Sequence, residues 1–152
     1  MTEYWNKPVQ TAEAFHGGWF HSGDLVRQDE DGYIYVVDRK KDMIISGGEN
    51  IYSAEVENVV AAHPKVAEVA IIGVPDPKWG ETPLAVIVAC DPPQAPPPTE
   101  AEIEAHCREH LAAFKRPQRI AVVDSLPPRN ASGKVDKSVL REQHAAPRSY
   151  AA

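Results

Sequence analysis

The amino-acid sequence predicts an α+β fold: a central mixed three-stranded sheet flanked by helices and preceded by a separate β-hairpin. Two observations lead to this prediction. Apolar runs of strand length lie at residues 66–74, 84–90 and 119–123, and segments with helix-capping signals alternate with them. The order helix, strand, strand, helix, strand, helix is typical of one sheet with helices packed against it.

Residues 1–38 contain the predicted hairpin. Gln28–Gly32 is the expected turn between strands at Leu25–Val26 and Tyr33–Val37. An isolated hairpin is only marginally stable in water. This segment also holds more large aromatic side chains than it can bury by itself, namely Trp5, Phe15, Trp19 and Phe20. We therefore expect residues 1–38 to pack on a further domain or to self-associate with another copy.

The next segment leads into the first helix of the sheet. The charged residues 38–42 separate the hairpin from Met43–Ile45, which we expect to be a short strand. Two glycines predict a tight loop at Ser46–Asn50. Ser53 is the expected N-cap of the helix that follows.

Prolines divide the second half of the sequence. Residues 75–83 are predicted as a loop, and residues 91–98 as a stiff polyproline-like connector. Thr99, with a glutamate three residues later, forms a capping box for a helix that reaches about Ala113. Asp136 is the expected N-cap of a short last helix.

The composition limits the class of protein. With 152 residues, of which 43% are hydrophobic and 25% charged, the chain resembles an ordinary soluble domain. A net charge of −6 argues against nucleic-acid partners, because phosphates require a positive surface. No run approaches the ~20 apolar residues of a membrane span, and two cysteines, Cys90 and Cys107, are too few for a disulfide framework. We expect a cytoplasmic protein without a transmembrane segment or secretory signal.

The segment Pro128–Lys134 is rich in Pro, Asn, Ser and Gly, so it is predicted as a loop that presents the ammonium of Lys134. Such a cation suits a phosphate or a developing carboxyl charge. The loop is not a Walker A motif, because Pro128 replaces its first glycine and Val135 its hydroxyl residue. By itself, a Gly-Lys pair is usually a solvated surface turn.

Two further motifs precede the Lys134 loop: Gly18–Leu25, with the letters GWFHSGDL, and the longer run Gly32–Glu57. In this order, the three motifs resemble the late core motifs of the adenylate-forming enzymes, which include acyl- and aryl-CoA synthetases, peptide-synthetase adenylation domains and beetle luciferases. The resemblance extends from about Glu3 to Arg141. It implies that residues 1–38 end a large AMP-binding domain, that residues 39–145 form the small C-terminal domain and that residues 146–152 are a disordered tail.

The resemblance also implies a nucleotide site. Asp24 would accept hydrogen bonds from both ribose hydroxyls, a task that suits the two acceptor oxygens of a carboxylate. Arg39 would contact the same ribose and the neighbouring phosphates. Lys134 would be the catalytic cation that stabilises charge between the substrate carboxylate and the α-phosphate. Without the resemblance, Asp24 would be a turn residue and Arg39 an ordinary surface arginine.

A hinge and a CoA site follow from the same resemblance. Lys41 matches the hinge between the two domains, with an exposed lysine in a charged linker as the alternative. The glycine-containing loop would line the tunnel for pantetheine, with these CoA-binding residues: Ser46, Gly47, Gly48 and Glu49. Arg116 would meet the CoA nucleotide, although Gln118 stands where related aryl-CoA ligases carry lysine.

We therefore interpret the chain as the C-terminal part of an ATP-dependent acyl-CoA synthetase, an AMP-forming ligase for a carboxylic acid, expected to be a fatty acid. ATP and the acid would give an acyl-adenylate, and CoA would then displace AMP. Mg²⁺ would be bound mainly by the large N-terminal domain, which also carries the phosphate loop and the acyl pocket. Without that domain as its partner, we expect the chain to be inactive.

Two other functions stay open. An adenylating enzyme that loads a carrier protein would share these motifs, although peptide-synthetase members usually show an Arg-Ile-Glu-type run where this chain has Glu49–Ala54. A non-catalytic binding module of the same fold is the second. The run His106–His110 matches an inverted zinc-peptidase pattern, but no third ligand accompanies it, so we assign no metal site.

Overall fold

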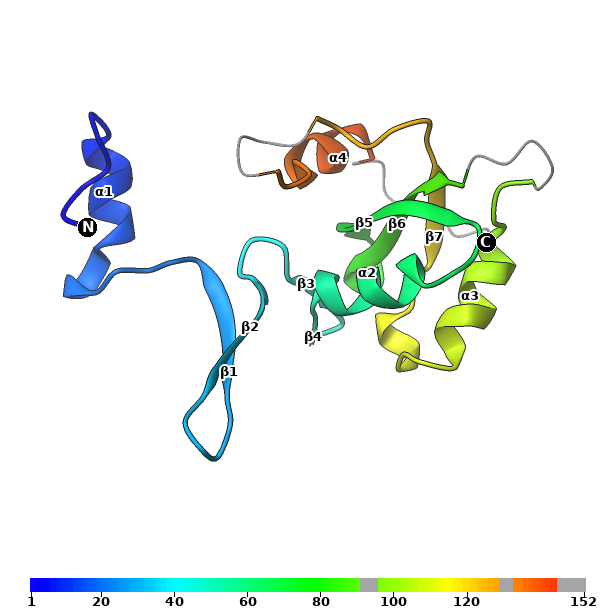
Figure 1. The fold of residues 1–152 in the computed structure, drawn as a ribbon, viewed down its shortest axis with the longest axis horizontal. Coiled ribbons are helices and arrows are strands. Elements are labelled where there is room, and N and C mark those ends of the chain that lie inside the picture. The colour runs from blue at the N-terminus through cyan, green and yellow to red at the C-terminus, as the bar shows by residue number, and fades with distance from the viewer. Residues whose placement is uncertain (91–95, 129–132, 145–152) are drawn as a thin grey trace. The chain divides into compact units, whose positions relative to one another are not determined.

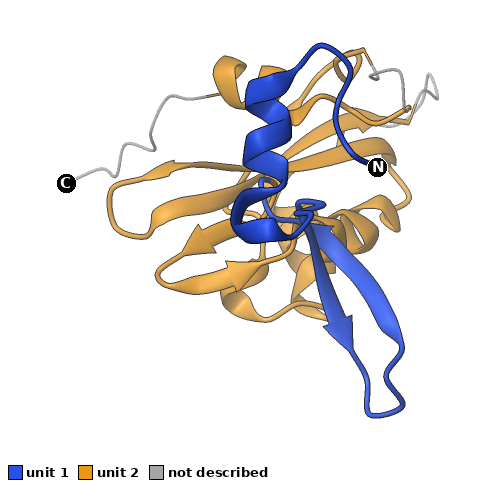
Figure 2. Cartoon of the chain, turned by 90° about the vertical axis from the view of Figure 1, so that its left-hand side faces the viewer, with its two compact units in different colours: residues 1–41 blue, residues 42–152 orange. Residues whose placement is uncertain are grey.

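The computed structural model describes residues 1–90, 96–128 and 133–144. The chain divides into two compact units, Met1–Lys41 and Asp42–Ala152, which Figure 2 shows in different colours. Most of the predicted connector at 91–98, part of the Lys134 loop and the predicted tail at 146–152 lie outside the described residues.

The first unit contains a helix, a single 3₁₀ turn and the hairpin; its elements are α1 (Pro8–Ala14), η1 (His16–Gly18), β1 (Asp24–Gln28) and β2 (Ile34–Arg39). The predicted hairpin is confirmed, since β1 and β2 pair antiparallel. Asp29 organises its turn: the Asp29 carboxylate accepts the backbone N–H groups of Asp31 and Tyr33 at 3.1 and 2.9 Å. Helix α1 was not predicted; it begins at Pro8, whose fixed φ suits the first position of a helix.

None of residues 1–41 is buried. Large apolar side chains are therefore left in contact with solvent: Trp5 is 89% exposed and Trp19 78% exposed. On the hairpin, Tyr33, Ile34 and Val36 are each about two-thirds exposed, at 67, 66 and 68%. The first unit has no core of its own, so its stability requires a surface that covers these side chains.

The second unit is built on a five-stranded sheet, consisting of β3 (Ile44–Ser46), β4 (Glu49–Ile51), β5 (Val66–Asp76), β6 (Gly80–Ala89) and β7 (Arg119–Val122). Strand β6 is central. It pairs antiparallel with β5 along its whole length, and its other edge takes β7 in parallel and meets β3 at its start. The predicted mixed three-stranded sheet is confirmed as β5, β6 and β7, and the hairpin of β3 and β4 extends it.

Two predicted loops are shorter than expected. Ser46–Asn50 contributes to both β3 and β4, so only Gly47 and Gly48 form the turn. Residues 75–83 are mostly strand, because β5 and β6 continue to a turn at residues 77–79. Pro75 is tolerated because β5 is an edge strand, where a missing N–H does not interrupt the sheet.

The helices of the second unit are α2 (Ser53–Ala61), α3 (Glu100–Arg108), the 3₁₀ turn η2 (Ala113–Lys115) and α4 (Lys137–Gln143). The capping box at Thr99 and the cap at Asp136 are confirmed. The predicted cap at Ser53 is wrong. Tyr52 is the N-cap, and Ser53 is the first helical residue, fully buried, with its hydroxyl accepting a hydrogen bond from Lys137 instead.

Two apolar clusters cover the two faces of the sheet. The cluster beneath α2 and α3 includes Ile71, Val56 and Ile103, whereas the cluster beneath α4 includes Ile72 and Leu140. Neighbouring residues of β5 enter opposite clusters because side chains alternate along a strand. Figure 1 shows α4 on one side of this sheet and α2 with α3 on the other.

One ion pair ties the start of α3 to the loop after α2. Lys65 Nζ lies 2.6 Å from Glu102 Oε1, and the Thr99 N–H donates to Glu102 Oε2 at 2.8 Å. These hydrogen bonds, that from Lys65 foremost, lower the pKa of Glu102 from 4.5 to about 2. Because the folded pKa is depressed, the unfolded chain binds more protons between these two values. The stability that this carboxylate contributes is therefore present above about pH 4.5 and lost as the pH falls towards 2.

We predict that Glu102→Gln flattens the pH dependence of the unfolding free energy in this window. Urea denaturation of the chain at a series of pH values measures it. Glu109→Gln, which changes an exposed glutamate just beyond the other end of α3, is the matched control and should keep the wild-type pH dependence. An unchanged pH dependence in Glu102→Gln would show that the Lys65 contact contributes no measurable stability.

Candidate functional site

The hairpin places Asp24 and Arg39 side by side. They are cross-strand partners at the open end of β1 and β2, and Arg39 Nε lies 3.3 Å from Asp24 Oδ1. Both side chains stay accessible, 28% exposed for Asp24 and 46% for Arg39. Two residues predicted from separate motifs therefore form one small charged site that offers carboxylate acceptors and guanidinium donors to the same ligand.

The backbone around Asp24 is held in a fixed turn. The Lys40 N–H donates to the Gly23 carbonyl at 2.8 Å, and the Asp24 N–H donates to Ser22 Oγ at 3.2 Å. Gly23 adopts a φ of 77°, a conformation that favours glycine. Beside this turn lies an open pocket within the first unit, lined by Glu13, His16, Phe20, His21, Ser22, Gly23, Asp24 and Lys40. A polar ligand of ribose size can reach Asp24 from this side.

The turn between β3 and β4 has two glycines for two different reasons. Gly47 and Gly48 have φ values of 58° and 89°, which together suit the tight two-residue turn of a hairpin. Gly47 is also constrained by space, because a Cβ built on it would lie 2.8 Å from Trp79 Cε3. The Gly47 N–H donates to the Trp79 carbonyl at 2.8 Å. A Cβ built on Gly48 would have no heavy atom within 4 Å.

A pocket of about 340 Å³ opens beside this turn, lined by Ser46, Gly47, Glu49, Trp79, Thr82, Ala113, Phe114 and Gln118. Three of the four predicted CoA-binding residues of the turn, Ser46, Gly47 and Glu49, thus line the same pocket as the rings of Trp79 and Phe114. Trp79 and Thr82 were missed in the sequence because no local motif connects them with the distant Gly47 turn. The Thr82 hydroxyl is buried without a hydrogen-bond partner in the described part of the chain. Mostly apolar walls with a few polar groups are typical of ligand pockets.

Arg116 lies in an adjoining pocket, together with Glu104 and Gln118. Its Nε donates to the Leu111 carbonyl at 3.1 Å, and its Nη1 lies 3.7 Å from Glu104 Oε1. The neighbouring Lys115 is held by the Glu55 carboxylate at 2.7 and 2.8 Å. The predicted nucleotide-binding arginine is therefore next to the pocket of the glycine turn, and it is already engaged by protein groups.

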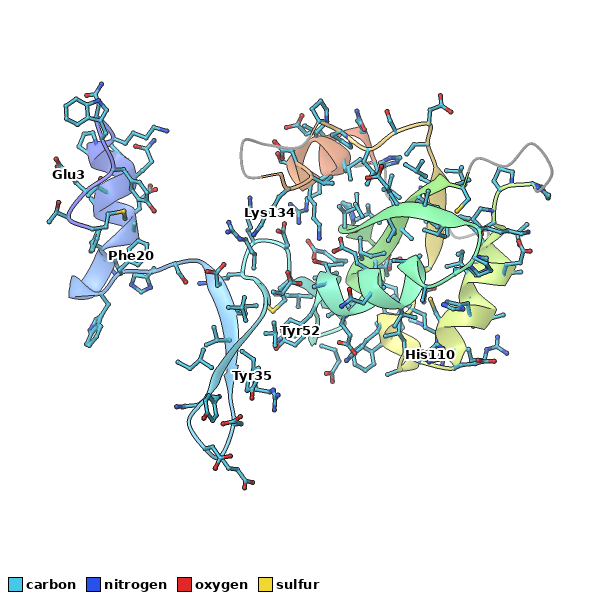
Figure 3. The ribbon with its side chains drawn as sticks, in the orientation of Figure 1. Glu3, Phe20, Tyr35, Tyr52, His110 and Lys134 are labelled. Carbon is cyan, nitrogen blue, oxygen red and sulfur yellow. The ribbon has the colours of Figure 1, made fainter. Side chains whose placement is uncertain are left out.

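Lys134 belongs to the second unit, whereas Asp24 and Arg39 belong to the first. Lys134 is exposed and follows Gly133, whose φ of 78° marks a tight turn. Figure 3 shows it in the segment that leads into α4. The boundary between the units falls directly after Lys41, and the next residue, Asp42, accepts from Arg141 Nη2 of α4 at 2.9 Å.

The histidine of α3, His106, has structural partners. His106 Nε2 lies 2.9 Å from the Val59 carbonyl oxygen, and its ring packs edge-on against His63. Burial lowers the pKa of His63, so this imidazole stays neutral at neutral pH. Residues 1–90, 96–128 and 133–144 contain no group of three His, Cys, Asp or Glu side chains placed to hold a metal ion. Nor does any helix in these ranges have the length and apolar character to cross a membrane.

Comparison with known proteins shows which family shares this sequence and fold. Residues 55–134 match the AMP-binding enzyme C-terminal domain family. The long-chain-fatty-acid–CoA ligase FadD13 of Mycobacterium tuberculosis is 48% identical over 146 residues, which cover 96% of this chain and 28% of FadD13. The fatty acid–[acyl-carrier-protein] ligase ScoC of Streptomyces coeruleorubidus is 46% identical over 143 residues, 94% of this chain and 27% of ScoC.

A solved structure agrees in both sequence and fold. The o-succinylbenzoate CoA synthetase of Bacillus subtilis, in complex with its acyl-adenylate intermediate, is 42% identical with a TM-score of 0.80. The match covers 100% of this chain and 29% of that enzyme, so the chain spans less than a third of these relatives. The chain belongs to the AMP-binding C-terminal domain family of the adenylate-forming enzymes.

Proposed function

We propose that the chain is the C-terminal part of an ATP-dependent acyl-CoA synthetase that activates a carboxylic acid, expected to be a fatty acid, and transfers it to CoA. The pocket lined by the Gly47 turn, Trp79 and Phe114 supports a thiol acceptor on a pantetheine arm. The pocket has mostly apolar walls and a volume of about 340 Å³, which suits this arm. The run Glu49–Ala54, which differs from the Arg-Ile-Glu-type run of peptide-synthetase members, favours CoA over a carrier protein as the bearer of that arm. The identity with a fatty-acid–CoA ligase supports the choice of acid.

In the first step, a carboxylate oxygen of the acid attacks the α-phosphate of ATP, and pyrophosphate leaves. Asp24 accepts hydrogen bonds from the two ribose hydroxyls, and Arg39 donates to the ribose and the phosphates. Their spacing of 3.3 Å lets one ribose contact both side chains. Lys134 stabilises the negative charge that develops between acid and phosphate. Mg²⁺ would be held mainly by the large domain together with the phosphates of ATP.

In the second step, the CoA sulfur attacks the acyl carbon, the bond from that carbon to the phosphate oxygen breaks, and AMP leaves. The thiol proton is released to solvent or base. Residues 46–49 and the rings of Trp79 and Phe114 guide the pantetheine arm, and Arg116 contacts the CoA nucleotide after releasing Glu104. The exposed aromatic side chains of residues 1–38 would pack on the large domain, and self-association would replace that contact in the chain alone.

The test is ATP–pyrophosphate exchange by the full-length enzyme, with a panel of carboxylic acids, with and without CoA. We expect exchange that depends on a fatty acid, thioester formation with CoA, and neither activity from the 152 residues alone. Acyl-adenylate made by the isolated chain would contradict the division of labour between the domains. No exchange with any acid would contradict the function itself.

Transfer to a carrier protein is the second candidate, because a relative of similar identity is named as an acyl-carrier-protein ligase. Replacing CoA by a phosphopantetheinylated carrier protein in the same assay separates the two. Faster acyl transfer to the carrier than to CoA would favour this alternative.

Lys41 is proposed as the hinge, since it is the last residue of the first unit. We predict that Lys41→Pro leaves adenylation near its normal rate and slows thioester formation, because a fixed φ resists the rotation between the two steps. Each half-reaction is measured separately in the full-length enzyme. Lys41→Ala, which keeps backbone freedom, is the control and should support both steps. Equal rates of thioester formation in both variants would remove the hinge assignment.

A further inference from the structure

Helix α4 begins with a cation in an unfavourable place. Lys137 is the first residue of the helix, where the backbone dipole presents partial positive charge. Nevertheless, its side chain is only 14% exposed. A lysine at this position needs strong compensation, and long charged side chains are rarely buried unless paired.

The compensation comes from α2. Lys137 Nζ lies 2.7 Å from Glu57 Oε1 and donates to Ser53 Oγ, also at 2.7 Å. Ser53 and Glu57 stand four residues apart, so they share one face of α2. The same Glu57 Oε1 accepts the backbone N–H of Ile71, on the edge strand β5, at 2.9 Å. One carboxylate therefore joins α2, β5 and the first residue of α4.

This junction lies three residues after Lys134. Of the residues between them, Val135 is half-buried against the apolar cluster under α4, and Asp136 caps the helix. Three residues of chain reach at most about 10 Å, so the position of Lys137 limits where the backbone of Lys134 can be.

We propose that Lys137 is a positioning residue for adenylation: its ion pair with Glu57 fixes the backbone from which Lys134 presents its ammonium. Lys137 itself touches no substrate. The inference rests on the proposed function and extends it, because it assigns the accuracy of the Lys134 position to a half-buried ion pair of Lys137, three residues later in the sequence. Glu57, which accepts the backbone N–H of Ile71 on β5, thereby also anchors the first residue of α4.

The test is Lys137→Met in the full-length enzyme, a change that keeps the apolar stem and removes the charge. We expect adenylation to slow by about tenfold to a hundredfold, the range that a misplacement of about 1 Å produces. Thioester formation from supplied acyl-adenylate should keep its rate. Lys65→Met is the matched control, because it breaks another lysine–glutamate pair of the same unit, at 2.6 Å, on the face opposite α4.

A double mutant separates positioning from general stability. If Lys137 acts only through Lys134, then Lys137→Met should cause no further loss of adenylation in a Lys134→Ala background. An additional loss of the same size, or equal losses in both half-reactions, would overturn the proposal. Should Lys137→Met fail to fold, Glu57→Gln decides. It keeps an oxygen acceptor for Ile71, and it should slow adenylation alone; a normal adenylation rate in folded Glu57→Gln would also overturn the proposal.

If the wild-type enzyme forms no acyl-adenylate with any acid, the proposed function itself fails. The role of Lys137 is contradicted independently of the function if the wild type forms acyl-adenylate and the folded Lys137→Met and Glu57→Gln variants form it equally fast.

Discussion

Lys134→Ala in the full-length enzyme is expected to slow adenylation by about a hundredfold to a thousandfold. This corresponds to about 3–4 kcal/mol in the barrier, the usual effect of removing one preorganised partner of a developing charge. The exposed ammonium follows Gly133 and lies two residues before Asp136, the N-cap of α4, so Lys134 is close to the fixed start of a helix. Thioester formation from supplied acyl-adenylate should stay near its normal rate.

Separate measurement of the two half-reactions checks this prediction. Arg108→Ala is the control, because it removes a cation of the same unit that is 65% exposed and forms an ion pair with Glu104, four residues earlier in α3. It should leave both half-reactions unchanged. If Lys134→Ala slows both steps equally, the loop has a structural role and the catalytic assignment is wrong.

Gly47→Val is expected to have the second largest effect, and on the other step. Valine is strained at a φ of 58°, and its Cβ would lie 2.8 Å from the indole of Trp79. Either the turn or the indole must move, and both line the pocket proposed for pantetheine. We expect thioester formation to slow by about a hundredfold, as for other misplaced positioning groups, with adenylation largely retained.

Gly48→Val is the matched control. It imposes similar strain, since Gly48 has a φ of 89°, but its Cβ would meet no atom within 4 Å. Comparing the CoA dependence of the two variants isolates the contact with Trp79 from the strain of the turn. Equal effects of both substitutions would mean that the backbone conformation alone matters, and the pocket would lose its support.

Local signals in the sequence predicted local structure well. The capping box at Thr99 and the cap at Asp136 depend on residues within four positions of each other, and both are present. The pairing of Asp24 with Arg39 was not predictable in this way, because the register shifts between Leu25 and Val26 and a regular hairpin would place Asp24 opposite Asp38. The roles of both side chains came from the resemblance and stay predictions.

Contacts between distant segments were not predictable in the same way. Ser53 looks like a helix cap, yet it is buried because Lys137, 84 positions later, uses its hydroxyl. Trp79 was expected in a loop and does lie in the turn at residues 77–79, but the pocket that its indole lines is completed by the distant Gly47 turn and Phe114. In both cases the role of the residue depends on a partner far along the chain, and one sequence alone does not name that partner.

The ion pair between Asp42 and Arg141 has a topological consequence. These residues lie at the first position of the second unit and in its last helix, 99 positions apart, and they are joined at 2.9 Å. The first residue of this unit and its last described helix are therefore joined, so the two ends of the described part of the unit are linked by a direct contact. Such an arrangement favours circular permutation. A linker that runs from α4 to Asp42 would follow a contact that the fold already makes.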